Sequence, residues 1–254
     1  MSAVWAIMRR EIQAYFVSPT AYAFMAVFLA LTSIGFAIGV FRHAMTPAAV
    51  LENMGVTIRT ALVAGPYGLV TWANFAILLS LPGLSMRLLS EERKAGTAEM
   101  LFTSPITTLQ IVLGKYFGTM AIFLLILLLT LPLPGFLVWK AQPEIAAIAC
   151  AYLGLLLYGG VIVAIGLFAS SLTENQFIAL VLSYAIVIPF TLVELVAPIA
   201  RPPWDAIFSA VSIGFALKQA SLGALDSAYL VLEVVLVSAF LFLAVRVVDS
   251  SRWR

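Results

Sequence analysis

The sequence predicts an all-α polytopic membrane protein in which residues 1–254 form a single transmembrane domain of six spans. Hydrophobic residues make up 63% of the chain and charged residues 10%, whereas a soluble domain has about 45–50% and about 25%. Six apolar stretches each reach the ~20 residues that cross a bilayer. These stretches are continuous rather than alternating, which argues against a closed β-barrel. Lipid is therefore the solvent that this chain requires.

An amphipathic elbow helix is expected over residues 3–17, before the first span. Apolar side chains recur there at helical spacing on one side, namely Val4, Trp5, Met8, Ile12, Tyr15 and Phe16. Such a helix can lie in the membrane interface. The alternative is a basic flank, carrying Arg9 and Arg10, that only orients the first span. The apolar run that follows is longer than the 7–15 residues of a signal peptide, so we expect it to be a retained helix.

The six spans are expected over residues 21–41, 66–86, 109–139, 145–172, 177–198 and 228–248. The third is too long for one straight crossing, and Pro132 and Pro134 are expected to break it. Residues 202–224 are semi-apolar, contain two glycines and are too short for two crossings. They must begin and end on the same side, so we expect outer re-entrant half-helices before the last span.

The distribution of basic residues predicts that both termini are cytoplasmic. With the N-terminus inside, nine of the 14 Lys and Arg residues lie on the inner side. The five on the outer side are Arg42, Arg59, Lys140, Arg201 and Lys218. Positive residues are enriched in cytoplasmic loops of membrane proteins.

The most polar stretch of the chain lies between the second and third spans. Its four consecutive charges, Glu91, Glu92, Arg93 and Lys94, are too costly to place in lipid. Gly96 can end one short helix there, and Thr97 can cap another that has Glu99 in its first turn. We therefore expect a short charged helix over residues 90–104 that can dock on a soluble partner. A solvated loop that only maintains topology is the alternative.

Three segments resemble a known family. The sequence EERKAGTAE from Glu91, followed by Thr103-Ser104-Pro105, resembles the coupling-helix signature of ABC type-2 permeases. The sequence REIQAYFVSPTAY from Arg10 is similar to the elbow and first span of the gliding-motility-type branch, and the C-terminal region resembles it too. The resemblance covers essentially the whole chain. It departs before the last span, where Gly214 and Leu225 stand in place of a His and an Arg of many relatives.

The resemblance implies a permease subunit of an ATP-binding cassette exporter in the bacterial inner membrane. The residues implied in coupling to the ATPase are Glu91, Glu92, Arg93, Lys94, Gly96, Thr97 and Glu99, with Thr173, Glu174 and Asn175 in a second contact. Arg9, Arg10 and Glu11 of the elbow helix would border the same subunit. The implied partners are a cytoplasmic ABC ATPase dimer, a second copy of the permease or a related permease, and a membrane protein with a large periplasmic domain.

We expect no enzymatic activity and no cofactor in this chain itself. The phosphate-binding pattern G-x-x-x-x-G-K-[ST] is absent from the sequence, so ATP and magnesium would be bound by the partner ATPase. The single His43 and single Cys150 make a poor metal site, and a net charge of +2 is too small to indicate nucleic acid. The sequence does not indicate the substrate.

Two carboxylates lie within apolar runs toward the outer side, Glu194 and Glu233. Such residues are candidates for transport or gating, and the alternative is a structural pair with Arg201 or Lys218. Two other functions stay open at this point. They are an ion-coupled secondary transporter, which would need central carboxylates and internal repeats, and a structural subunit of a motility or secretion complex.

Overall fold

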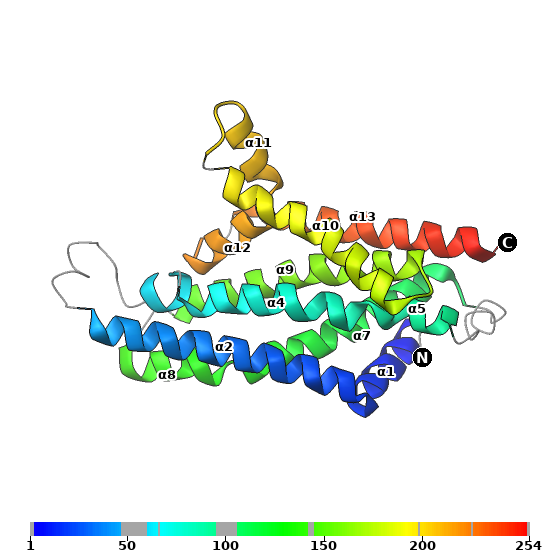
Figure 1. The fold of residues 1–254 in the computed structure, drawn as a ribbon, viewed down its shortest axis with the longest axis horizontal. Coiled ribbons are helices and arrows are strands. Elements are labelled where there is room, and N and C mark those ends of the chain that lie inside the picture. The colour runs from blue at the N-terminus through cyan, green and yellow to red at the C-terminus, as the bar shows by residue number, and fades with distance from the viewer. Residues whose placement is uncertain are drawn as a thin grey trace.

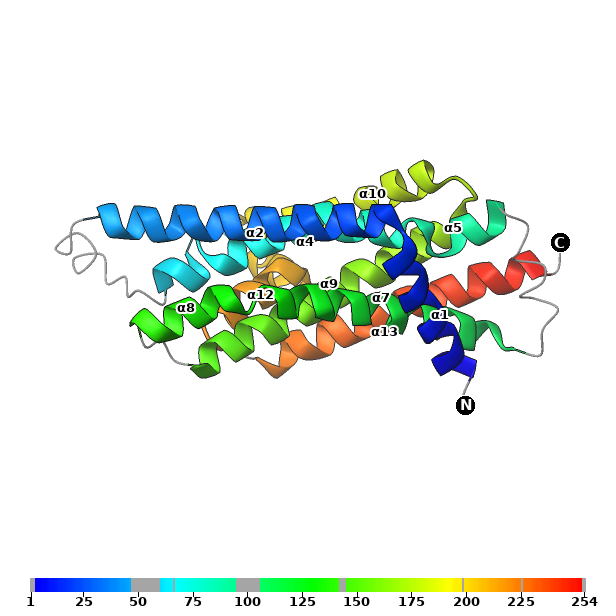
Figure 2. The ribbon, with the colours of Figure 1, turned by 90° about the horizontal axis from the view of Figure 1, so that it is seen from below.

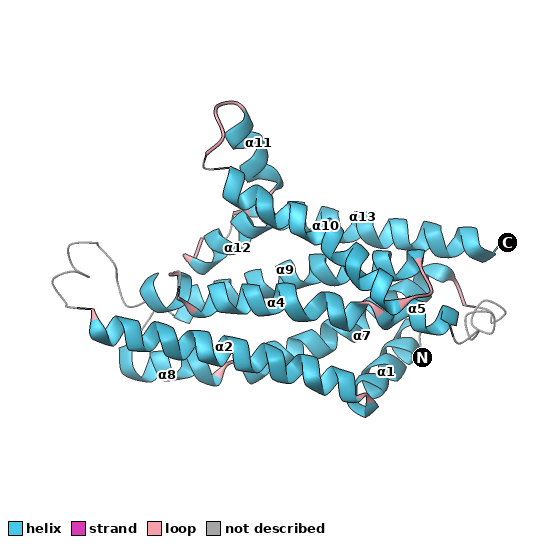
Figure 3. Ribbon diagram, viewed as in Figure 1, coloured by secondary structure: helices cyan, strands magenta, loops and turns pink. Residues whose placement is uncertain are grey.

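The computed structural model describes residues 3–46, 60–65, 67–94, 106–141, 145–197, 199–224 and 226–252. All regular structure within these residues is helical (Figure 3). Six stretches are long and apolar enough to cross a membrane, namely Pro19–Met45, Leu62–Lys94, Thr108–Trp139, Ile145–Leu172, Gln176–Val196 and Ser227–Ser250. The predicted all-α fold with six spans is therefore confirmed.

The helices follow one another along the chain with short connections. They are α1 (Ala3–Val17), α2 (Pro19–Met45), the π-helix η1 (Thr60–Ala64), α4 (Leu69–Ser85), α5 (Arg87–Lys94), α7 (Thr108–Leu129), α8 (Pro132–Ala141), α9 (Ile145–Leu172), α10 (Gln176–Val196), α11 (Trp204–Val211), α12 (Ile213–Ser221) and α13 (Ser227–Arg252). The predicted break in the third span is confirmed, because α7 ends at Leu129 and α8 begins at Pro132.

The long helices form an elongated bundle with two different ends (Figure 1). One end carries α1, α5 and the C-terminal part of α13, and we call it the proximal end. The other carries α8, η1 and the far end of α2, and we call it the distal end (Figures 1 and 2). Helix α1 crosses the bundle at a steep angle to α2 instead of continuing its direction (Figure 2).

Helix α9 forms the centre of the bundle. In its most apolar 18-residue stretch 61% of residues are buried, against 17% in α10 and in α13. Helices α4, α5, α7, α10, α12 and α13 all pack against it. Lipid gives no hydrophobic drive for helices to associate, so close packing of small residues carries more of the stability. The sequence of α9 suits this role because Gly and Ala recur along its length.

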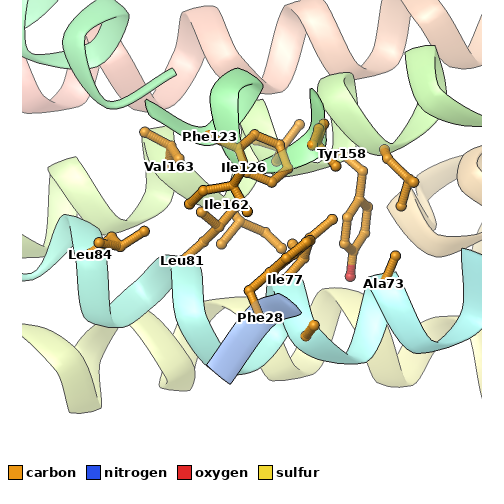
Figure 4. Packing of buried hydrophobic residues seen from close by; sticks show 14 of the residues in the cluster. Phe28, Ala73, Ile77, Leu81, Leu84, Phe123, Ile126, Tyr158, Ile162 and Val163 are labelled. Carbon is orange, nitrogen blue, oxygen red and sulfur yellow. The ribbon is translucent and has the colours of Figure 1, made fainter. Parts of the chain in front are cut away.

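The core lies where α2, α4, α7 and α9 meet (Figure 4). Phe28 of α2 meets Phe123 of α7 edge to face, with ring centroids 6.3 Å apart. Ile77 and Leu81 of α4 and Ile162 of α9 fill the space around this pair and are fully buried. This core fixes the long helices that position both ends of the molecule.

The amphipathic stripe predicted for the first helix is only partly the buried face. Tyr15 is buried, but Trp5 and Phe16 of that stripe are about half exposed. Ile7, which the stripe omits, is buried because α1 packs along α7. A sequence pattern shows which residues are apolar but not which neighbour covers them.

Two short helices occupy the stretch predicted as half-helices. Helix α11 has no buried residue, whereas α12 buries one face that includes Ile213, Leu217 and Ala220. Helix α12 packs against α9 and α10. The stretch therefore adds no seventh crossing but closes the distal side of the bundle.

Candidate functional site

The charged helix α5 begins at a bend that a serine of α9 fixes. Met86 separates α4 from α5, and the hydroxyl of Ser170 donates a hydrogen bond to its carbonyl oxygen at 2.9 Å. The same hydroxyl oxygen accepts from the backbone N–H groups of Leu89 and Ser90 at 2.9 and 3.0 Å. These N–H groups lie in the first turn of α5, where no carbonyl within the helix can accept them. Ser170 thus caps α5 from the neighbouring helix and ties it to α9.

The elbow helix α1 lies against α7 at a notch formed by two glycines. A Cβ atom added at Gly114 would lie 2.7 Å from Ile7, and one added at Gly118 would lie 2.8 Å from Glu11. Glycines four residues apart lie on the same side of a helix, so they let the two backbones approach closely. The notch brings the charged side chains of α1 next to those of α5 and α7.

A four-residue ion-pair network joins these three helices. The ammonium group of Lys115 on α7 lies 2.6 Å from Oε1 of Glu11 on α1 and 3.0 Å from Oε1 of Glu92 on α5. Arg10 on α1 contacts Glu92 at 2.5 Å and Glu11 at 3.9 Å. The Lys115 side chain is 2% exposed, whereas Arg10 is 54% exposed. Two cations balance two carboxylates, as a largely buried charge cluster requires.

A second set of contacts holds the elbow between α1 and α2. The Tyr15 hydroxyl donates to the carbonyl oxygen of Leu84 at 3.1 Å and lies 3.1 Å from the hydroxyl of Thr119. The guanidinium of Arg87 lies 4.6 Å from the centre of the Tyr15 ring and donates to Ser18 at 2.5 Å. Burial raises the pKa of Tyr15 to about 12, so its hydroxyl keeps its proton at neutral pH.

Two polar hollows flank α5 at the proximal end. The first has a volume of about 460 Å³ and lies between α1, α5 and α7, lined in part by Arg10, Arg87 and Glu91. The second, of about 450 Å³, lies between Lys94 at the end of α5 and the turn that carries Glu174 and Asn175. The two together present α5 as a charged ridge with a groove on each side.

The structure brings most of the predicted coupling residues to this one end. The charges of α5, Glu91 to Lys94, border the hollows, and Arg93 lies within electrostatic reach of Glu174. The turn that holds Thr173, Glu174 and Asn175 is confirmed as a tight link between α9 and α10, in which Asn175 caps α10 by accepting from the N–H of Phe177. Arg9 is exposed on α1.

One part of the predicted coupling helix falls outside the described residues. Gly96, Thr97 and Glu99 lie there, together with the rest of residues 95–105. The described part begins at Arg87, three residues before the predicted start at Ser90. The earlier start follows from the bend at Met86, which Ser170 fixes.

Three residues that hold the site together were missed from the sequence. Lys115 read as part of an apolar span, and Tyr15 as one member of an apolar stripe. Ser170 carried no signal, because a serine in an apolar helix more often bonds its own backbone. A lysine within a predicted span was the available signal for Lys115, since such a charge needs partners.

The two intramembrane carboxylates lie away from this end. Glu233 on α13 is 2% exposed, and its Oε1 has no hydrogen-bond partner among the described residues. Glu194 on α10 lines a separate distal pocket together with Lys218. Within the described part of the chain, neither carboxylate forms an ion pair with Arg201 or Lys218. No group of three or more His, Cys, Asp and Glu residues there is placed to hold a metal ion.

Comparison with protein families gives one match. Residues 66–246, more than half of the chain, match the family described as ABC-2 family transporter protein. The chain belongs to the ABC-2 transporter family. A search of curated proteins found no match. The ABC-2 permease is thus a multi-pass membrane protein of a family whose permease domains are generally non-catalytic and work with an ATP-binding cassette partner.

Proposed function

We propose that this chain is the membrane-spanning subunit of an ATP-driven exporter and that an ATPase binds its proximal end in the cytoplasm. ATP and magnesium would be bound and used in that separate subunit. One observation carries the proposal: α5 presents exposed charges between two polar hollows while its other side is fixed to three helices.

The anchoring is what makes α5 suited to receive a force. The hydroxyl of Ser170 ties the start of α5 to α9, and Glu92 ties it to α1 and α7 through Arg10 and Lys115. A helix that is hydrogen-bonded and ion-paired to its neighbours moves with them rather than bending away. Displacement of α5 by a bound partner would therefore be passed to the long helices, as in rigid-body rearrangements of other transporters.

The partners follow from the family resemblance and the basic residues. We propose a cytoplasmic ABC ATPase dimer on the proximal ends of two permeases, which are two copies of this chain or this chain and a related one. In the gliding-motility-type branch, a membrane protein with a large periplasmic domain would join them. The proximal end carries Arg10, Arg87, Arg93 and Lys94, which is the distribution typical of a cytoplasmic side.

The proposal is tested by purification of the tagged chain from native membranes in mild detergent, followed by mass spectrometry and an ATPase assay. We expect a protein with a phosphate-binding loop to co-purify at one copy per permease. The variant Glu91→Lys with Lys94→Glu reverses two exposed charges of α5 and should abolish this association. The control Asp205→Lys reverses a charge on α11 and should leave it intact.

Two results would contradict the proposal. Unchanged co-purification and ATPase stimulation in the α5 variant would show that α5 is not the docking element. Repeated purification without any ATPase, together with transport that depends on a proton gradient and not on ATP, would instead favour an ion-coupled transporter.

A further inference from the structure

The distal pocket is a second polar site, at the opposite end of the bundle from α5. It has a volume of about 320 Å³ and lies between η1, α4, α10 and α12. Its polar lining residues are Thr71, Asn74, Glu194, Lys218 and Ser221. A cavity of this size within an otherwise apolar bundle is in the range of small-molecule sites.

Opposite charges line this pocket without meeting. Glu194 extends from α10 and Lys218 from α12, and no hydrogen bond or ion pair to either side chain occurs among the residues that the structure describes. Glu194 is only partly exposed. Charges in such surroundings are costly unless they are paired, so the gap between them is suited to a ligand that carries the complementary charges.

The remaining polar groups supply hydrogen-bond acceptors. The Oδ1 atom of Asn74 is buried and has no hydrogen-bond partner in the described residues. The hydroxyls of Thr71 and Ser221 donate to the backbone carbonyls of Gly65 and Lys218, at 2.9 and 2.7 Å, so their lone pairs remain to accept. A protonated primary amine has three donors and no acceptor, which matches this set around Glu194.

A glycine makes room for the carboxylate. A Cβ atom added at Gly214 would lie 2.0 Å from Oε2 of Glu194, so any other residue at this position would push the carboxylate away. The carboxylate is thus seated against the backbone of α12, one turn before Lys218 on the same helix. This places the anionic and cationic lining groups along one wall of the pocket.

We propose that the distal pocket binds a zwitterion with a primary ammonium and an acidic group, as in an aminoalkyl phosphate. The ammonium is held by Glu194 and Asn74, and the acidic group by Lys218. The same chemistry occurs in the headgroup of phosphatidylethanolamine and in free phosphoethanolamine. The proposal concerns the distal end alone and needs no ATPase.

The test uses the purified full-length chain in uncharged detergent and calorimetric titration with phosphoethanolamine. Glu194→Gln and Lys218→Met should each weaken binding about tenfold or more, the effect of losing one charge-assisted hydrogen bond. Gly214→Ala should also weaken it, because it displaces the carboxylate without changing any charge. Asp205→Asn and Arg201→Gln remove charges outside the pocket and should bind as the unmodified protein does.

Ligands that lack one charge separate the contributions. Ethanolamine lacks the phosphate and glycerol 3-phosphate lacks the ammonium, so both should bind more weakly than phosphoethanolamine. Binding of glycerol 3-phosphate as tight as that of phosphoethanolamine would overturn the proposal, as would unchanged binding in the Glu194→Gln, Lys218→Met and Gly214→Ala variants. Should Glu194→Gln fail to fold, the other two variants still decide the matter.

Native mass spectrometry of the same protein identifies the source of the ligand. Retention of phosphatidylethanolamine, lost in Glu194→Gln, assigns the pocket to a lipid headgroup. Binding of soluble phosphoethanolamine without lipid retention assigns it to a free zwitterion. Absence of both overturns the proposal.

Discussion

The ammonium group of Lys115 on α7 lies 2.6 Å from the carboxylate of Glu11 on α1, and the lysine side chain is almost completely buried. Its second partner, Glu92 on α5, lies 3.0 Å away. One lysine therefore joins the elbow helix and the charged helix to the core of the bundle.

Replacement of Lys115 by Met should destabilise the protein. The change leaves two carboxylates that are each less than one-fifth exposed with only the exposed Arg10 beside them, and we expect a loss of about 2–4 kcal/mol. Denaturant unfolding in mild detergent measures it. Addition of Glu11→Gln and Glu92→Gln to Lys115→Met should restore much of the loss. If the triple variant is as unstable as the single one, packing rather than charge explains the effect.

The neighbouring glutamates of α5 should respond differently to reversal of charge. Glu91 is exposed, whereas Glu92 lies between Arg10 and Lys115. Glu91→Lys should therefore leave the melting temperature within about 2 °C of the unmodified protein and weaken ATPase binding. Glu92→Lys adds a third cation to the network and should lower the melting temperature markedly. Equal melting temperatures of the two variants would contradict the placement of Glu92 in the network.

Removal of the Ser170 hydroxyl should loosen α5. Ser170→Ala leaves the N–H groups of Leu89 and Ser90 without their acceptor, and loss of a cap costs about 1 kcal/mol. Hydrogen exchange should accelerate in α5 and not in α7. Ser250→Ala is a suitable control, since Ser250 is exposed and bonds only within its own helix. Equal exchange of α5 in Ser170→Ala and Ser250→Ala would refute the capping role.

The buried hydroxyl of Tyr15 should make stability fall at high pH. Its pKa is raised by burial from the ordinary 10 to about 12 in the folded protein. The contribution is fully present below pH 10 and is lost as the pH rises from 10 toward 12, because the unfolded chain releases its proton first. Tyr15→Phe should fall less steeply with pH between 10 and 12. Parallel pH profiles of the two proteins would contradict this.

Labelling of single cysteines tests the orientation in the membrane. In a Cys150→Ala background, cysteines placed at Lys94 and Asn175 should react with an impermeant maleimide only from the cytoplasmic side. A cysteine at Arg201 should react only from the outside. The opposite pattern would invert the assignment of the proximal end and exclude a cytoplasmic ATPase there.

The sequence predicts the architecture well because the requirement to cross lipid acts on each helix separately. Length and apolarity define the spans, and Pro132 marks the break in the third one. The contacts between helices are less accessible. That Lys115 meets Glu11 and Glu92 depends on the Gly114 and Gly118 notch, which only the packing of α1 on α7 reveals.

The distal pocket shows the same limit. Glu194 and Lys218 are visible in the sequence as charges near the ends of apolar segments, but their separation across a cavity is a property of how α10 and α12 pack. Gly214 reads as a helix interruption in the sequence, whereas in the structure it is the space that the Glu194 carboxylate fills.

The central helix α9 joins the two ends of the molecule as one stiff rod. Ser170 holds α5 at its proximal end, and Gly154 lies against Ala220 of α12 near its distal end, a separation of about 24 Å along the axis. Helix α9 contains no proline over its 28 residues, whereas α4 and α10 beside it contain Pro82 and Pro189. Proline weakens the helix that holds it, so these two neighbours can bend while α9 stays straight. A push on α5 would thus reach the wall of the distal pocket without passing through any loop.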